Sequence, residues 1–461
     1  MSSAHDRHAL YYLETAEARP DDWRWFDEEW PEIQRAWQWV SESSGDEDLT
    51  LDYVETFFGF QEQRGLHQDV IEWCRQGLKV VGATADRTRE AAVLVMLANA
   101  HSSIGEAHRA IELYERALEI YRQDGNRAEE AVILNNLGAV YDDLGQVHQA
   151  IEYFEQSLDV SRAIGGRRDE AIALSNLGMA YAALGELSRA ADFHGQSLAI
   201  AHEIKSLQLE ADAMGNLGAA HYRMGDARGA AEYYRRALAI YSDTGNRTGQ
   251  ANAFDNMGLA YAAVGEMAEA ITSYEQALDI HRSVGNRYGE AAALGNLGIA
   301  YSDLGEHGRA VRYHEQALKV HRSAGDRHGE ASTLGNVGAA YYRLGELGLA
   351  IRLFEQAVAI HREVGNRFGE GVVLSNLAGA YDDIGNAPES LAHYRRALQI
   401  HREVGNRRSE GITLFNMSTV LNKLNDRQQA LNLALAALEI LQRVEFPGAS
   451  VVRETLERWQ K

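Results

Sequence analysis

Cysteine, proline and long apolar runs are scarce in this sequence. Among 461 residues there are four prolines and one cysteine, Cys74. A single cysteine excludes an internal disulfide framework and is compatible with a reducing compartment. No run of about 18 apolar residues occurs, and the polar residues 1–7 do not resemble the apolar core of a signal peptide. We therefore expect no membrane insertion and a cytoplasmic location.

Basic residues are also in deficit. The chain has 45 lysines and arginines against 67 aspartates and glutamates, which gives a formal net charge of -22. Because nucleic-acid binding draws its affinity from clustered Lys and Arg, this balance argues against a nucleic-acid partner. The motifs of zinc proteases, P-loop NTPases and serine hydrolases are absent. The sequence therefore predicts no enzymatic activity, no catalytic residue, no metal and no cofactor.

Internal repetition is what the sequence has in abundance. Written in rows of 40, it aligns with itself without gaps over residues 86–444, which gives nine units. The expected organisation is a tryptophan-rich helical cap or linker at residues 1–45, a degenerate unit at 46–85, nine regular units at 86–444 and a closing helix at 445–461.

Each row has the pattern of two helices. In one row the first helix carries Leu134, Leu137 and Gly138 on one face, and the second carries Phe154 and Leu158. Residues spaced by three and four share a helical face, so the two faces are expected to pack together into an all-α fold. Residues that favour the helix N-cap stand at the row starts Asp86, Asn126, Ser206, Asn246, Asn286, Asp326, Asn366 and Asn406.

Two further features of the rows concern their joints. Arginines at helix starts stand three residues before a glutamate, as Arg127 does before Glu130, and we interpret them as structural ion pairs. The row of Ser206 departs from the usual Gly-Asn-Arg entry, with Lys205 before it and Leu207 after it. This departure predicts a looser or bent joint.

The signature positions of one known family are occupied by Leu137, Gly138, Tyr141, Ala150, Phe154 and Ser157. Over most of its length the sequence thus resembles the tetratricopeptide repeat family, and its long repeats are most similar to those of Partner of Inscuteable and kinesin light chains. The resemblance implies a right-handed α-solenoid that binds proteins. Residues 8–39 also resemble the segment that joins nucleotide-switch modules to repeat arrays in bacterial STAND-type signalling ATPases.

A second stripe of the first helix lies about 200° from the apolar stripe and is expected to face a concave groove. An asparagine recurs in it at Asn136, Asn176, Asn216, Asn256, Asn296, Asn336, Asn376 and Asn416. One amide can both donate to and accept from the backbone of an extended guest peptide. The matching asparagine in the similar families implies the same role. In the alternative interpretation, each asparagine bonds its neighbouring unit and sets the register.

Other groove positions vary and are expected to give specificity. The predicted peptide-binding residues among them are Tyr222, Arg223, Tyr342, Arg343, Asp143, Asp303 and Asp383. Tyrosine and arginine can hold acidic or aromatic guest groups, and the aspartates indicate a guest with some basic character. The alternative is a solvated polar surface.

The sequence therefore predicts an interaction scaffold that binds a peptide or protein segment in the groove. A second hypothesis is the sensor or regulatory module of a STAND-type ATPase, with a nucleotide-binding regulatory domain as partner at the N-terminal end. A third is a tetratricopeptide-containing phosphatase regulator, but the residues before the array show no catalytic constellation.

Overall fold

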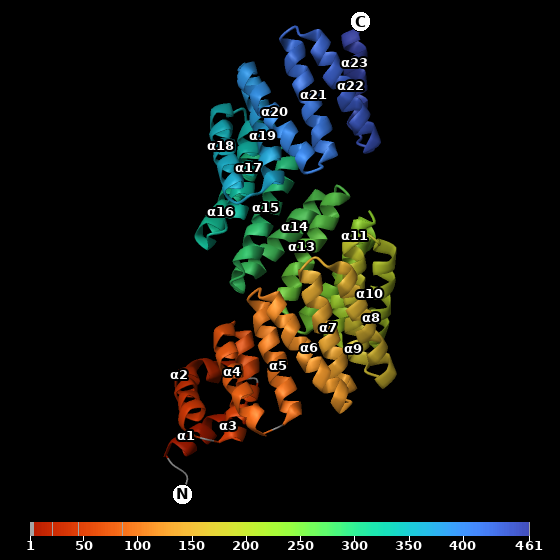
Figure 1. Ribbon diagram of the computed structural model, residues 1–461. Coiled ribbons are helices and arrows are strands. Elements are labelled where there is room, and N and C mark those ends of the chain that lie inside the picture. Colours follow the sequence, from red (N-terminus) through yellow and green to blue (C-terminus); the bar gives the residue numbers. More distant parts are fainter. Residues whose placement is uncertain (1–3, 21, 45, 85, 461) are drawn as a thin grey trace. The chain divides into compact units, whose positions relative to one another are not determined.

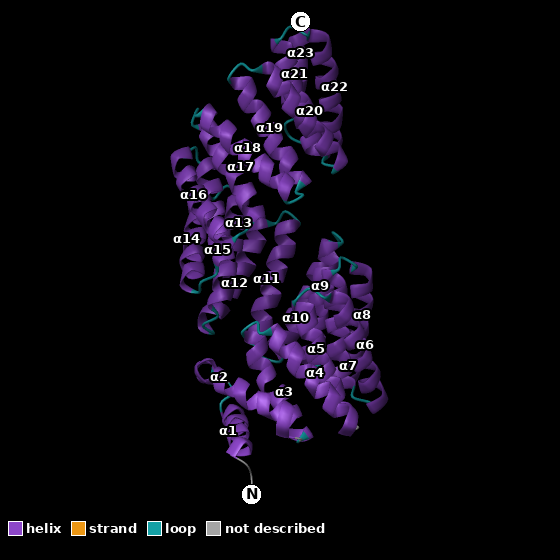
Figure 2. Cartoon of the chain, turned by 60° about the vertical axis from the view of Figure 1, so that its left-hand side comes forward, coloured by secondary structure: helices purple, strands orange, loops and turns teal. Residues whose placement is uncertain are grey.

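The computed structural model describes residues 4–20, 22–44, 46–84 and 86–460. Within these residues the chain forms helices and turns without a strand, which confirms the predicted all-α fold (Figures 1 and 2). No described helix combines the length and the apolar character needed to cross a membrane. The chain divides into two compact units, unit 1 (Met1–Asp226) and unit 2 (Ala227–Lys461).

Unit 1 begins with two helices and a short π-helical turn and continues with helix pairs. Its elements are α1 (Ala4–Ala18), α2 (Trp23–Trp39), η1 (Val40–Ser44), α3 (Glu47–Gln63), α4 (His67–Thr84), α5 (Arg87–Ser103), α6 (Ala107–Asp124), α7 (Arg127–Asp143), α8 (Val147–Ile164), α9 (Arg167–Ala183), α10 (Leu187–Glu203) and α11 (Leu207–Arg223).

Unit 2 consists of one helix, five helix pairs and a closing helix. Its elements are α12 (Ala227–Asp243), α13 (Arg247–Ala263), α14 (Met267–Ser283), α15 (Arg287–Asp303), α16 (His307–Ala324), α17 (Arg327–Arg343), α18 (Leu347–Glu363), α19 (Arg367–Asp383), α20 (Ala387–Glu403), α21 (Arg407–Lys423), α22 (Arg427–Arg443) and α23 (Ala449–Gln460). From α5 on, the odd-numbered helices up to α21 are called first helices and the even-numbered ones second helices.

A ring of the second helix packs into a notch of the first helix in most rows. Leu134 and Leu137 of α7 are fully buried beside Phe154 of α8. A Cβ atom added at Gly138 would lie 2.5 Å from the Phe154 ring, so only glycine leaves room for the ring in its present position. The same notch holds Tyr274 over Gly258, Phe354 over Gly338, and a histidine ring in two rows.

The predicted N-caps form in all of these rows but one. The side chains of Asp86, Asn126, Asn246, Asn286, Asp326, Asn366 and Asn406 accept a backbone N–H of the first helical turn. The prediction is wrong for Ser206, whose side chain makes no capping hydrogen bond. Serine is as good a cap residue as Asn or Asp, so nothing in its residue type explains the missing bond.

The tryptophan-rich segment is part of an aromatic core in unit 1. Trp37 is buried and stacks on Trp73 of α4 with ring centroids 4.3 Å apart. Trp30 stacks on the same ring, and the Tyr53 hydroxyl of α3 donates to the Ala9 carbonyl of α1 at 2.7 Å. Helices α1 and α2 therefore cover the pair formed by α3 and α4.

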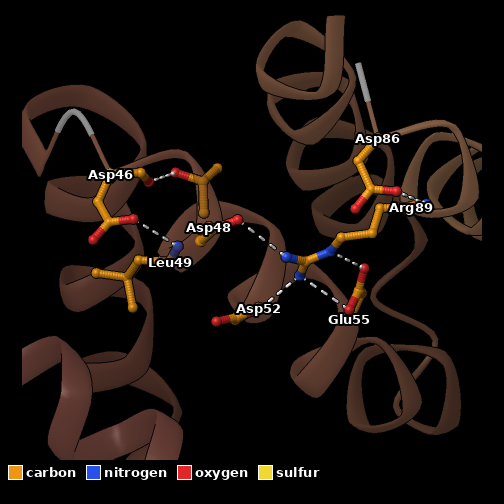
Figure 3. A network of polar contacts seen from close by, with 8 residues as sticks. Asp46, Asp48, Leu49, Asp52, Glu55, Asp86 and Arg89 are labelled. Carbon is orange, nitrogen blue, oxygen red and sulfur yellow. Dashed lines mark hydrogen bonds and ion pairs between the residues drawn. The ribbon is translucent and has the colours of Figure 1, made fainter. Parts of the chain in front are cut away.

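A half-buried arginine joins this N-terminal part to the regular rows. Arg89 of α5 reaches across to α3, where it lies 2.6 Å from Asp52, 2.9 Å from Glu55 and 3.6 Å from Asp48 (Figure 3). The backbone N–H of Arg89 also donates to the cap residue Asp86. One side chain thus fixes the start of α5 against three carboxylates of the preceding pair.

The helix-start arginines form ion pairs that recur from row to row. Glu170 is buried and accepts from Arg162 of the preceding helix and from Arg167 of its own helix. Burial opposes the ionisation of this carboxyl, but the two hydrogen bonds outweigh it and lower the pKa of Glu170. The arrangement recurs around Glu130, Glu290, Glu330, Glu370 and Glu410.

The two rows next to the division between the units lack this arrangement. In one of them the His202 Nδ1 atom lies 3.5 Å from the Glu210 carboxylate, and Leu207 stands where the arginine would be. In the other row Arg247 donates to the neutral Gln250, which in turn donates to the Tyr241 carbonyl. The unusual joint expected at Ser206 therefore coincides with a local loss of ion pairing.

Two histidines take the place of the aromatic ring in the notch. His194 and His314 are each 2% exposed, and the Nδ1 atom of each has no hydrogen-bond partner among the described residues. Burial lowers the pKa of both imidazoles to about 4. The folded chain therefore holds both rings in the neutral form at pH values where the unfolded chain would protonate them.

We predict that these two rings make the fold sensitive to acid. Between pH 6.5 and 4 the unfolded chain binds more protons than the folded chain, so stability falls as the pH falls through this window. At pH 5 the expected loss is about 2 kcal/mol for each ring. The double variant His194→Phe/His314→Phe, which uses the residue found at Phe154, should lose correspondingly less. Urea unfolding at pH 7 and pH 5 measures this, and an equal loss in both proteins would contradict it.

The notch gives a second prediction. Gly138→Ala should destabilise the chain by about 1–3 kcal/mol, because the new methyl group overlaps the Phe154 ring. Gly195 of α10 is a matched control, since a Cβ there meets nothing within 4 Å. Gly195→Ala should stabilise the chain by up to about 1 kcal/mol through helix propensity. Thermal or urea unfolding of the two variants should therefore shift in opposite directions.

Candidate functional site

The eight asparagines lie at the same position of eight first helices, α7 to α21. Their side chains are partly buried or exposed, and none of the eight is fully buried. Each lies two residues before the notch position, which faces the second helix, so the amide points to the opposite side of the first helix. We call this side the first-helix face.

In unit 1 two of these amides bond the neighbouring row. Asn176 Nδ2 donates to Asn135 Oδ1 at 2.8 Å, and Asn216 Nδ2 donates to Ser175 Oγ at 3.1 Å. Each acceptor lies 41 residues earlier, on the preceding first helix. We call each of the eight asparagines a rung. At these two rungs the amide bonds the neighbouring row, as expected in the alternative interpretation in which asparagine sets the register between rows.

In unit 2 the same amides have different neighbours. The position 41 residues before Asn336 and Asn376 is a glycine, Gly295 or Gly335, which offers no side-chain acceptor. Before Asn296 it is Asp255, whose carboxylate lies 2.9 Å from the buried His281 ring. Within the parts of the chain that the structure describes, the side chains of Asn256, Asn296, Asn336 and Asn376 make no hydrogen bond.

A cavity of about 320 Å³ lies on the first-helix face of unit 2. It brings together five of the predicted site residues, which are Tyr342, Arg343, Asn376, Asp383 and Asn416. These residues come from α17, α19 and α21, and consecutive first helices of this unit are in contact. The stacking of rows thus places side chains that are 40 residues apart in sequence around one hollow.

The electrostatics of the cavity centre on the last two residues of α19. The Tyr342 hydroxyl donates to Asp383 Oδ2 at 2.5 Å, and burial together with this bond raises the pKa of Tyr342 to about 12. Lys423 Nζ of α21 lies 2.7 Å from Asp382 Oδ2. One carboxylate therefore has a cationic partner, and the other has a neutral phenol.

The floor of the cavity was not predicted as part of the site. It includes Phe354 and Tyr394, buried rings of the second helices α18 and α20. Burial raises the pKa of Tyr394, and a hydrogen bond with Asn416 opposes that rise. In the sequence these rings have the spacing of core residues. The signal that could have found them is the small residue above each ring, Gly338 or Ala378.

The remaining predicted residues lie outside this cavity. Tyr222 and Arg223 end α11 in unit 1, where Tyr222 is partly buried and Arg223 is exposed. Asp143 is exposed at the end of α7, and burial together with its charge raises the pKa of the neighbouring Asp142. Asp303 is exposed at the end of α15.

Comparison with known families agrees with this architecture. A family model described as Tetratricopeptide repeat matches residues 129–203, 249–323, 290–363 and 369–443, which together make up more than half of the chain. Two other models with the same description match residues 211–244 and 93–128. The chain therefore belongs to the tetratricopeptide repeat family. A search of curated proteins gave no match.

Solved structures are similar to this chain at low sequence identity. A signal transduction ATPase with numerous domains (STAND) with a tetratricopeptide repeat sensor, from Pyrococcus horikoshii, is 13% identical, with a TM-score of 0.59 over 95% of this chain and 71% of that one. BtubC (BKLC) from P. vanneervenii is 24% identical, with a TM-score of 0.42 over 49% of this chain and 92% of that one. Aspartyl phosphate phosphatase F from Bacillus subtilis is 13% identical, with a TM-score of 0.49 over 78% and 94%.

The contrast between the two units gives a stability prediction. Asn176→Ala should destabilise the chain by about 1 kcal/mol, because it removes a hydrogen bond between rows and leaves Asn135 without a partner. Asn296→Ala should leave stability unchanged or raise it slightly, since its amide bonds no described residue and alanine favours helix. Urea midpoints of the two variants test this, and equal destabilisation would contradict it.

Proposed function

We propose that the first-helix face of unit 2 binds an extended segment of another protein. Membership of the tetratricopeptide repeat family supports a protein-interaction scaffold or a regulatory module. The observation that carries the proposal is the row of four amides, Asn256 to Asn376, that bond nothing in the described chain and lead into a cavity at α17–α21.

The spacing of the amides suits a peptide backbone. Helices in contact lie about 8–10 Å apart, so successive rungs are about 10 Å apart. An extended peptide advances ~3.3 Å per residue, and one rung therefore serves about three guest residues. An amide can donate to a guest carbonyl and accept from a guest N–H, so this grip does not depend on the guest's side chains.

The amides supply only part of the binding free energy. Each hydrogen bond contributes a net ~1 kcal/mol, so four rungs contribute ~4 kcal/mol, and a micromolar complex, at about 8 kcal/mol, needs at least as much again from contacts to the guest's side chains. In unit 1 the amides of Asn176 and Asn216 are already used between rows. We therefore assign peptide binding to unit 2 and register-setting to these two rungs of unit 1.

A second candidate function is a sensor within a STAND-type switch. The specific observation is the alignment of 95% of this chain with the Pyrococcus horikoshii structure, which is described as having a tetratricopeptide repeat sensor. At 13% identity this likeness supports the fold only. A partner of this kind would contact the aromatic N-terminal part of unit 1, whereas the leading proposal uses unit 2.

Lysate capture followed by an affinity measurement tests the leading proposal. The variant Asn256→Ala/Asn296→Ala/Asn336→Ala should bind the captured partner roughly a hundredfold more weakly, at ~1 kcal/mol for each rung. A matched control, Gln276→Ala/Gln316→Ala/Gln356→Ala, removes three exposed amides from second helices of the same unit and should bind normally. Circular dichroism confirms that both variants fold.

Two results would count against this proposal. One is a partner that binds the asparagine variant with unchanged affinity. The other is a partner that the glutamine variant loses as well, because that would move the contact to the second helices.

A further inference from the structure

The first-helix face of unit 2 changes character along its length. At the position three residues after the asparagine, α13 and α15 carry large aliphatic side chains, Leu259 and Ile299, which are 38% and 48% exposed. The same position in α17 and α19 is Ala339 and Gly379, and both line the cavity. An apolar surface near Asn256 and Asn296 therefore gives way to a polar hollow at α17–α21.

The polar end favours a cation at one place. Asp382 and Asp383 are the last two residues of α19, where the helix dipole also attracts positive charge. Lys423 neutralises Asp382, but the only partner of Asp383 is the neutral Tyr342 hydroxyl, as far as the described residues go. Arg343, which pairs with no described carboxylate, balances the overall charge of the cavity. The cavity therefore favours a guest with one basic group at the right position over a guest that is basic throughout.

These observations define a spacing. Helix α15 carries Ile299, and α19 carries the two aspartates. The two helices are two rungs apart, which is about 20 Å. An extended peptide covers that distance in about six residues. The aliphatic and the basic recognition elements would therefore be about six residues apart in the guest.

We propose that the guest of unit 2 is an extended segment that presents an aliphatic side chain to Leu259 and Ile299 and, about six residues away, a lysine or arginine to Asp382 and Asp383. This inference rests on the proposed function and adds the chemistry of the partner. The amides between the two ends hold the backbone, so the side chains at the ends decide which segment binds.

Lys423 is the internal competitor for the guest's basic group. It comes from the next first helix, its side chain is 60% exposed, and its ammonium group pairs with Asp382, one of the two carboxylates to which the guest's basic group is presented. An exposed ion pair of this kind contributes little to stability, so a guest cation displaces it at low cost. Removal of the lysine charge should then strengthen binding, which is the opposite of what loss of a direct guest contact would do.

Fluorescence anisotropy with the full chain tests this inference. The probes are labelled dodecapeptides of Ser and Gly that carry one Leu and one Arg at every separation and in both orders, with a matched set in which Glu replaces Arg. The Arg peptides should bind best at a separation of about six residues. Lys423→Met should raise their affinity about two- to fivefold, and Asp383→Asn should lower it by a similar factor. The Glu peptides should respond in the opposite directions.

Lys319→Met provides the matched control, because this lysine is exposed on the second helix α16 and should not alter binding. The inference is overturned if no peptide of the set binds, if affinity ignores the separation, or if Lys423→Met weakens the Arg peptides. A captured partner that needs the asparagines but ignores Asp383→Asn would refute this inference and leave the proposed function standing. A partner indifferent to both changes would refute the two together.

Discussion

The contact between a second-helix ring and the notch in the first helix is the constraint on which the other features depend. At Gly138 the Phe154 ring occupies the space that a side chain would need, so the two helix backbones approach closely. Because the glycine must face the ring, this contact fixes the rotation of the first helix about its own axis. Because side chains advance by 100° per residue, Asn136 must then point away from the second helix. Repetition of the notch in successive rows turns the amides to the same face.

Most of the fold could be predicted from the sequence because several local signals agree with one another. The apolar stripes, the capping residues and the glycines at row ends specify the same helix pairs, and such agreement across levels favours a single fold. Ser206 shows the limit of a propensity. It follows Lys205, which takes the left-handed conformation that glycine takes in other rows, yet its hydroxyl makes no cap. A preferred cap residue at the right position therefore does not by itself guarantee the capping bond.

The residue types of the candidate site could be predicted from the sequence. Which asparagines bond the neighbouring row and which leave their amides available could not. Eight identical asparagines look equivalent in a row alignment, although what each can bond depends on a residue 41 positions earlier. Asn135 and Ser175 supply an acceptor in unit 1, and Gly295 and Gly335 supply none in unit 2. That signal is present in the sequence, but it becomes meaningful only when the contact between consecutive first helices is known. The small residues above the buried rings of the cavity, Gly338 and Ala378, likewise become informative only when the packing of the helices is known.

The constant row length has a consequence for how such a surface can change. Seven rows end in a glycine with the left-handed conformation, so most rows meet the next through the same kind of turn; these glycines are Gly125, Gly165, Gly245, Gly285, Gly325, Gly365 and Gly405. Gain or loss of a whole 40-residue row that ends in such a glycine would leave the turns between the remaining rows in the same conformation. The stretch that the amides can span would then grow or shrink in fixed increments of about three partner residues. Recognition length in this architecture is therefore a stepwise quantity, set by the number of rows whose amides are available to the partner.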